Sequence, residues 1–163
     1  MTTVAMTTTT LTPAVQSGRL TRHYVQKIRA TPEEVFPLLC PELEKAWLPG
    51  WDARMIHSAS GVAERGAVFE TTTAIWVVTE HDAPRRVAFT RFQADRVLVQ
   101  IEITLGRHVD GHTAVCITYT HTPTDDASRA ILAAARESDW LDTMHFWEGS
   151  MNAWFDKKQD AAA

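Results

Sequence analysis

Tyr119 and His121 are the first side chains of chemical interest in this sequence, because they lie two residues apart in a segment that alternates apolar and polar residues. Side chains two residues apart on a β-strand point to the same face, so both would point inward together with Val115 and Ile117. An inward histidine and tyrosine could orient a ligand or act as an acid and a base. The alternative is a histidine at the edge of the core whose ring hydrogen-bonds to the backbone.

Arg91 raises a similar question in the segment 86–92, where it shares one face with Val87 and Phe89. An inward arginine could hold a ligand carboxylate or a phenolate oxygen. Because Arg91 lies near the end of this segment, its long side chain could equally reach solvent. Glu70 and Glu80 pose the same alternative, since a buried glutamate could transfer protons whereas an exposed strand face commonly carries glutamates.

A stripe of bulky residues near the C-terminus could line a binding site. Trp140, Met144, Trp147 and Met151 recur at helical spacing. Such a stripe is commonly core, but where it faces a cavity, Trp and Met form polarizable walls for an apolar or aromatic ligand. Phe146 falls on the opposite side of the same helix, where it would mark a subunit contact or have no role.

Two further tryptophans, Trp47 and Trp51, flank a Pro-Gly pair in the segment CPELEKAWLPGWDARMI, residues 40–56. Pro49 and Gly50 mark a turn of the chain. Because tryptophan is costly to leave in water, these rings either close the core or form the wall of a cavity.

No combination of residues indicates a metal or a nucleotide cofactor. The seven histidines form no two-histidine metalloprotease motif, and the pair His108 and His112 flanks a turn. Cys40 and Cys116 are too few for a disulfide framework or a zinc site. The sequence also has no phosphate-binding loop, dinucleotide fingerprint or nucleophile elbow. We therefore predict no metal and no cofactor, and we assign no catalytic residue.

The composition is that of a single soluble domain, with 163 residues, of which 45% are hydrophobic and 22% charged, and a formal net charge of −4. The negative charge disfavours nucleic-acid binding, and no apolar run approaches the roughly 20 residues that span a bilayer. The N-terminus does not resemble a secretory signal, so we predict a cytoplasmic location. Residues 1–17 are Thr-rich and predicted to form a flexible tail, with either Met1 or Met6 as the start.

The sequence pattern predicts a run of strands between short helices and a long helix. Strands are expected at 19–29, 54–58, 67–72, 74–80, 86–92, 96–105 and 113–121, paired antiparallel through short turns. Thr31 and Pro32 begin one short helix, and residues 41–48 form a second. Residues 125–158 are helical with a break at 136–139, which leaves a long helix from about 140 to 157.

This order of elements is similar to the helix-grip fold of the START-related SRPBCC superfamily, which includes birch-pollen-allergen-like and polyketide cyclase-like proteins. The resemblance is carried by IRATPEEVFPLLCPELEKAWLPGWDARMI, GAVFETTT, IWVVTEHDAPRRVAFTRF and VQIEITL, followed by the helical end. It implies one α+β domain over residues 18–158, with a frayed end at 159–163. In this fold a curved antiparallel sheet of six to seven strands wraps around the long C-terminal helix, and two short helices follow the first strand.

The resemblance also implies a cavity between the sheet and the long helix. Members of the superfamily bind lipids, sterols or polyketides, act as cyclases or are uncharacterised, and they share no catalytic motif. The leading hypothesis is therefore a lipid- or polyketide-type carrier or sensor that binds a small apolar or aromatic molecule. A polyketide cyclase-like or related enzyme that uses the same pocket, and a protein-interaction or co-chaperone module, are the alternatives. A homodimer stays open.

The residues that this hypothesis assigns to ligand binding come from the strands, the tryptophan turn and the long helix. They are Trp51, Trp76, Arg91, Tyr119, His121, Trp140, Met144, Trp147 and Met151.

Overall fold

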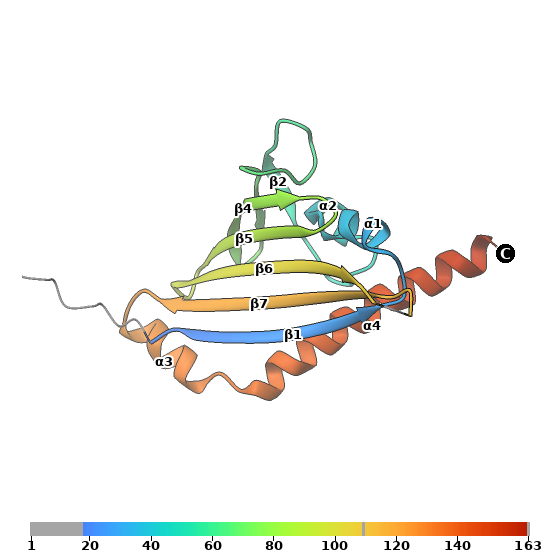
Figure 1. Ribbon diagram of the computed structural model, residues 1–163. Helices are drawn as coiled ribbons and strands as arrows, with labels where there is room; N and C mark the ends of the chain where they lie inside the picture. Colours follow the sequence, from blue (N-terminus) through green and yellow to red (C-terminus); the bar gives the residue numbers. More distant parts are fainter. Residues whose placement is uncertain (1–17, 109, 163) are drawn as a thin grey trace, which may run out of the picture.

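A seven-stranded sheet and a long helix dominate the computed structural model, which describes residues 18–108 and 110–162 (Figure 1). In chain order the elements are β1 (Leu20–Ile28), α1 (Pro32–Val35), the 3₁₀-helix η1 (Phe36–Leu39), α2 (Pro41–Glu44), β2 (Arg54–His57), β3 (Val68–Thr71), β4 (Ala74–Asp82), β5 (Arg86–Gln93), β6 (Val97–Arg107), β7 (Thr113–Pro123), α3 (Asp126–Ala134) and α4 (Glu137–Ala162). The predicted tail at 1–17 lies outside the described residues.

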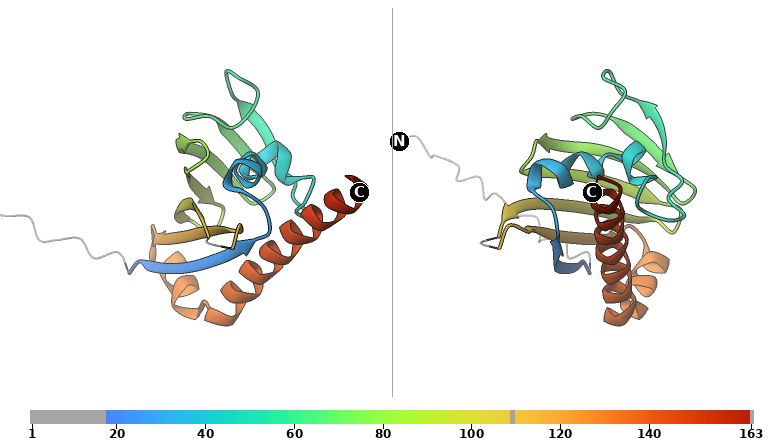
Figure 2. Two further views of the ribbon diagram at one scale, coloured as in Figure 1. Left: turned by 45° about the vertical axis from the view of Figure 1, so that its right-hand side comes forward. Right: turned by 90° about the vertical axis from the view of Figure 1, so that its right-hand side faces the viewer.

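The strands form one sheet in the order β1-β7-β6-β5-β4-β3-β2, and each neighbouring pair is antiparallel, as predicted. The alternation of the sequence decides which face is buried. In β6, Val99, Ile101 and Ile103 are buried, whereas Gln100 and Glu102 are exposed. A sheet with one apolar face needs a covering layer, which α4 and the short helices provide (Figure 2).

The two predicted short helices differ from the structure in detail. The backbone N–H of Thr31 donates to the Glu34 carboxylate at 3.0 Å, which fixes the start of α1. Pro37 has no backbone N–H, so the chain continues as η1 rather than as one helix. The predicted helix at 41–48 was too long, because α2 ends at Glu44 and the backbone N–H of Trp47 donates to the Glu44 carbonyl three residues back.

The C-terminal helical region is interrupted as predicted, although the break begins one residue and ends three residues earlier than predicted. Asp125 caps α3 by accepting a hydrogen bond from the Ser128 backbone N–H at 2.8 Å, and α3 ends where Ala135 becomes extended. Beyond that break, α4 extends past both predicted ends, because the sequence up to Ala162 contains no proline and alanine favours helix strongly. None of the helices in the described ranges is long and apolar enough to cross a bilayer.

The bulky stripe of α4 points toward the sheet, as its spacing predicts. Trp140, Met144 and Met151 are all buried, and Trp147 is partly exposed. Phe146 lies on the opposite side of the helix, where half of its surface is exposed. The rotation of α4 about its own axis therefore places the tryptophans and methionines against the inner face of the sheet.

Hydrogen bonds from α4 side chains to the backbone of β1 hold that rotation. The Lys27 N–H donates to the Glu148 carboxylate at 2.9 Å, and the Asn152 amide donates to the Lys27 carbonyl at 3.0 Å. The same Asn152 side chain accepts from the Arg29 N–H at 2.8 Å. β1 is an edge strand, so these side chains take the place of a missing neighbouring strand.

The burial of β7 yields a first prediction. Ile117→Asp should unfold the domain, because an unpaired carboxylate at this 2%-exposed position costs several kcal/mol out of the roughly 5–15 kcal/mol that stabilises a domain. Cys116→Asp, one residue earlier on the exposed face, should unfold at nearly the wild-type urea concentration. Similar midpoints for the two variants would contradict the described register.

The contact between α4 and β1 yields a second prediction. Asn152→Leu should lower the free energy of unfolding by about 2–4 kcal/mol, because it leaves two backbone groups of β1 without partners. Asp156→Ala is the matched control one turn further along, since it removes an exposed ion pair with Arg29 that is worth about 1 kcal/mol or less. Equal losses in chemical denaturation would show that the Asn152 hydrogen bonds do not hold the helix.

Candidate functional site

An aromatic space, which we call the inner cavity, lies between the sheet, α2 and α4. Its lining residues are Pro41, Glu44, Trp51, Phe69, Trp76, Phe89, Ile101, Ile103, Tyr119 and Trp147. Its volume of about 20 Å³ is room for one water molecule, because the rings themselves fill the interior. The Trp76 ring stacks on Phe69 at 5.3 Å and meets Trp51 edge-on at 5.8 Å between ring centroids.

The two tryptophans of the Pro-Gly turn have different positions. Trp47 is buried, and its indole N–H donates to the Leu38 carbonyl at 2.8 Å, so this ring closes the core. Trp51 is partly exposed and lines the inner cavity, and its indole N–H donates to the Pro41 carbonyl at 2.9 Å. Trp47 therefore closes the core, whereas Trp51 forms part of the cavity wall.

A larger space of about 260 Å³, the outer cleft, adjoins the inner cavity on the side of the α3–α4 break. It is lined by Arg22, Arg91, Tyr119, His121, Asp139, Trp140, Thr143, Met144 and Trp147. Tyr119 and Trp147 border both spaces and separate them. The cleft therefore brings together six of the predicted ligand-binding residues from β5, β7 and α4, namely Arg91, Tyr119, His121, Trp140, Met144 and Trp147.

Arg91 lies on the inner face of β5 with Val87 and Phe89, and its side chain remains partly exposed where it lines the outer cleft. Its guanidinium carbon lies 4.7 Å from the ring centroid of Trp76 and 5.6 Å from that of Tyr119, so two aromatic faces hold the cation. Loss of hydration lowers the pKa of Arg91, although arginine stays protonated in proteins. Its Nε is buried and has no hydrogen-bond partner among the described residues.

Trp140 contributes another buried donor without a hydrogen-bond partner. Its indole Nε1 is buried and finds no acceptor in the described part of the chain. The ring packs on Tyr119 at 5.0 Å between centroids, and Trp140 lines the cleft. The buried Nε of Arg22 also lacks a hydrogen-bond acceptor within the described residues. A buried donor without an acceptor costs about 1–3 kcal/mol, so three of them on residues that line one cleft indicate a site for an acceptor such as a carboxylate.

Tyr119 and His121 lie beside Arg91 in uncharged form. Burial raises the pKa of Tyr119 above its ordinary value, and burial lowers the pKa of His121 below its ordinary 6.5. The ring nitrogen Nδ1 of His121 lies 3.4 Å from the Leu20 carbonyl oxygen. This is the contact expected for a histidine at the edge of the core whose ring hydrogen-bonds to the backbone. At neutral pH the cation that faces the cleft without an ionic partner is therefore Arg91, not His121.

The other charged residues of the cleft are already paired. Arg22 forms an ion pair with Glu137 at 3.3 Å and donates to the Ala135 carbonyl at 3.1 Å. Asp139 is held by Arg136 at 2.6 Å. These pairs leave the charge of Arg91 as the one that a bound anion can neutralise.

Glu44 is the site residue that sequence reasoning missed. It lines the inner cavity, so part of its surface stays accessible, yet loss of hydration raises the pKa of its carboxyl to about 8. No hydrogen bond or ion pair of this carboxyl occurs within residues 18–108 and 110–162. A helix of four residues has too little periodicity to indicate from sequence that Glu44 points inward while Glu42 pairs with Lys45.

The remaining candidates are distributed elsewhere. Met144 is fully buried and borders the outer cleft, whereas Met151 is buried in the core and lines neither space. Glu70 and Glu80 form surface ion pairs with Arg54 and Arg86, the exposed alternative of the sequence analysis. No cluster of three potential metal ligands occurs in the described residues.

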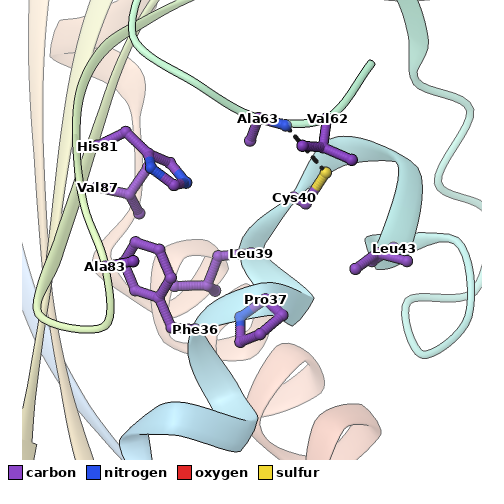
Figure 3. Close-up of a pocket in the computed structure, with 10 residues that line it drawn as sticks. All are labelled: Phe36, Pro37, Leu39, Cys40, Leu43, Val62, Ala63, His81, Ala83 and Val87. Carbon is purple, nitrogen blue, oxygen red and sulfur yellow. Dashed lines mark hydrogen bonds between the residues drawn. The ribbon is translucent and has the colours of Figure 1, made fainter. Parts of the chain in front are cut away.

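A third hollow, the apolar groove, is about 270 Å³ and lies between the short helices, the β4–β5 hairpin and the loop at residues 62–63. Figure 3 shows Phe36, Leu39 and Cys40 facing His81 and Val87 across it. The groove is almost wholly apolar: the Cys40 sulfur accepts from the Ala63 N–H, and the His81 ring packs edge-on against Phe36. We therefore assign the candidate site to the outer cleft and the inner cavity, where donors lack acceptors.

Comparison with known proteins identifies the fold. No protein-family model matches the sequence, and no curated protein matches it. Among solved structures, Ara h 8.0201 superimposes with a TM-score of 0.63 and 13% identity over 85% of this chain and 99% of that one. The fold is a helix-grip fold. A hypothetical protein from Helicobacter pylori gives a TM-score of 0.65 and 14% identity over 92% and 99% of the two chains.

A further structural neighbour is named for its role. An HSP90 activator from Plasmodium falciparum gives a TM-score of 0.51 and 12% identity over 64% of this chain and 75% of that one. At such identities the likeness shows the fold alone. The function of this chain must therefore be argued from its own cleft.

The buried carboxyl of Glu44 yields a third prediction. Its pKa is about 8 in the folded protein and near 4.5 when unfolded, so between these values the folded state holds the extra proton. The contribution of Glu44 to stability therefore falls as pH rises from about 4.5 to about 8. Relative to Glu44→Gln, the wild type should lose several kcal/mol of unfolding free energy across this range.

Urea denaturation at pH 5, 6.5 and 8 measures this difference. Glu42→Gln is the matched control, because Glu42 lies on the same short helix in an exposed pair with Lys45. Its profile should follow that of the wild type. Parallel profiles for Glu44→Gln and the wild type would place the Glu44 carboxyl in water.

Proposed function

We propose that the protein binds a small aromatic or apolar molecule that carries an anionic group, such as a carboxylate or phenolate, in the outer cleft. The observation that carries the proposal is Arg91, a partly buried cation whose buried Nε has no hydrogen-bond partner and whose guanidinium lies against the rings of Trp76 and Tyr119. An anion that accepts from Arg91 and from the Trp140 indole N–H satisfies both donors at once.

The walls of the cleft suit the apolar part of such a ligand. Trp140, Met144 and Trp147 offer adaptable, polarizable surfaces from α4, and Tyr119 closes the floor. The volume of about 260 Å³ is just below the 300–1,000 Å³ of typical small-molecule pockets. This size favours a ligand of one or two rings over a lipid chain within the lipid- or polyketide-type hypothesis.

An enzyme that uses the same pocket is the second candidate function. The observation in its favour is that Arg91, Tyr119, His121 and Glu44 line two adjoining spaces. Converging titratable groups are typical of sites that transfer protons. Turnover of a bound ligand, detected by mass spectrometry after incubation, would favour the enzyme over the carrier.

The protein-interaction alternative receives less support. Phe146 is half exposed, but its neighbours three and four residues away on the helix are Asp142, Thr143, Gly149 and Ser150. A single ring among polar and small residues is not an extended apolar patch. The hypothesis also includes a cytoplasmic location and a homodimer. Cell fractionation would test the location, and size-exclusion chromatography would test the oligomeric state.

Binding of 2-naphthoate tests the proposal. Arg91→Gln should weaken 2-naphthoate binding about 10- to 100-fold, because a hydrogen bond to a charged group is worth roughly 1.5–3 kcal/mol. Isothermal titration calorimetry gives the dissociation constants. Uncharged 2-ethylnaphthalene should bind both proteins alike, which separates loss of charge from loss of packing.

The matched control is Arg85→Gln, which removes an exposed arginine paired with Asp82 at the end of β4. This variant should bind 2-naphthoate with wild-type affinity. If Arg91→Gln and Arg85→Gln bind 2-naphthoate equally well, the outer cleft is not an anion site and the proposal is wrong.

A further inference from the structure

Among the residues described, Glu44 is the one acidic side chain that lines the inner cavity. It comes from the last position of α2 and lines the inner cavity opposite Tyr119 of β7. The two side chains are close enough that the charge of Glu44 contributes to the raised pKa of Tyr119. The remaining lining is aromatic and aliphatic, with Trp51, Trp76 and Trp147 around the carboxyl.

Packing alone does not account for a glutamate at this position. Glu44 is partly buried among aromatic rings, and its carboxyl makes no hydrogen bond and no ion pair within the described ranges, although removal of a polar group from water without a partner costs free energy. The other groups nearby do not neutralise it. Arg91 is stacked on Trp76 and Tyr119, and Glu42 and Lys45 of α2 pair with each other at the surface.

We propose that the inner cavity is the buried half of the ligand site, and that Glu44 donates a hydrogen bond from its carboxylic acid to a carbonyl oxygen of the ligand. This inference rests on the proposed function, because it extends the same ligand inward from the outer cleft past Tyr119 and Trp147. The ligand class is then an aromatic carbonyl compound whose acidic group is held by Arg91 at the opposite end.

The chemistry of the cavity favours a carbonyl oxygen over an ammonium group. Burial among aromatic rings favours the neutral form of a carboxylic acid, and a neutral acid is a hydrogen-bond donor. A cationic ligand would require Glu44 to ionise in an apolar space, and it would also be repelled by the Arg91 cation, which lies on the faces of Trp76 and Tyr119. A carbonyl oxygen accepts the proton of the acid without creating charge.

Trp51 and Trp147 provide the entry. With a volume of about 20 Å³, the inner cavity holds a ring only after a lining side chain has moved. Most lining rings are buried, but Trp51 and Trp147 are partly exposed. Trp51 is held by a single side-chain hydrogen bond, to the Pro41 carbonyl, so rotation of this ring outward costs little polar bonding.

Two neutral probes of nearly equal shape test the inference without using Arg91. 2-Acetylnaphthalene carries a carbonyl oxygen, and 2-ethylnaphthalene has a methylene group in its place. The wild type should bind the ketone about 3- to 10-fold more tightly, which is the usual net value of one hydrogen bond. Quenching of the tryptophan fluorescence gives both dissociation constants.

Variants of Glu44 assign the preference to its side chain. Glu44→Leu, which keeps the size and removes the donor, should bind both probes equally. Glu44→Gln should retain the preference, because its amide still donates. Glu42→Gln is the control on the same helix and should behave as the wild type. Thermal unfolding of each variant verifies that the fold is retained, and Glu44→Gln keeps the test valid if the leucine variant does not fold.

The pH dependence distinguishes an acid from an amide at this position. The ketone preference of the wild type should decline above pH 8, where the carboxyl ionises, whereas that of Glu44→Gln should stay constant. Tyr119 across the cavity has a raised pKa and keeps its proton in this range. A wild-type preference that does not change from pH 6 to pH 9 would contradict donation by Glu44.

Three further results would overturn the inference. The first is equal affinity of the wild type for both probes, and the second is an unchanged ketone preference in Glu44→Leu. The third is no binding of either probe, which would mean that the inner cavity admits only a water molecule. Its failure is distinguishable from that of the proposed function, because 2-naphthoate binding tests Arg91 separately. A loss of 2-naphthoate affinity in Arg91→Gln with no effect of Glu44→Leu would keep the outer cleft and reject the inner subsite.

Discussion

The attachment of α4 to the exposed edge of β1 is the contact on which the rest of the structure depends. Glu148 and Asn152 satisfy the backbone groups of Lys27 and Arg29 that a further strand would otherwise pair. Hydrogen bonds of this kind are directional, so they fix both the height and the rotation of the helix. An apolar stripe alone would leave α4 free to slide or rotate along the sheet.

That fixed rotation creates the two spaces of the candidate site. Trp140, Met144 and Trp147 are held over β5 and β7, where Arg91 and Tyr119 project from the sheet. The break before Glu137 stops the helical region from covering the outer cleft completely, while the tryptophan turn closes the inner cavity. The same helix thus completes the core at Met151 and leaves a cleft two turns earlier.

The polar groups of the site are arranged at opposite sides of Tyr119. Arg91 faces the outer cleft as a cation without an ionic partner, and Glu44 faces the inner cavity as a carboxylic acid without a hydrogen-bond partner. Each costs stability in an otherwise apolar interior. A protein that only needed a filled core would be more stable with apolar residues at both positions, which is why both groups are assigned to ligand recognition.

The sequence by itself determined the sheet, the order of the elements and the inward direction of Tyr119 and Met144, because strand and helix periodicity place side chains on one face regardless of distant contacts. It also placed the break before the long helix within three residues, and Pro37, which has no backbone N–H, limits the first short helix. The end of α2 and the site could not be predicted in this way. The turn after Glu44 ends α2 through backbone hydrogen bonds that no side-chain period encodes. The inward position of Glu44, the stacking of Arg91 on Trp76 and Tyr119, and the small volume of the inner cavity depend on residues far apart in sequence, so they follow from packing and not from any local pattern.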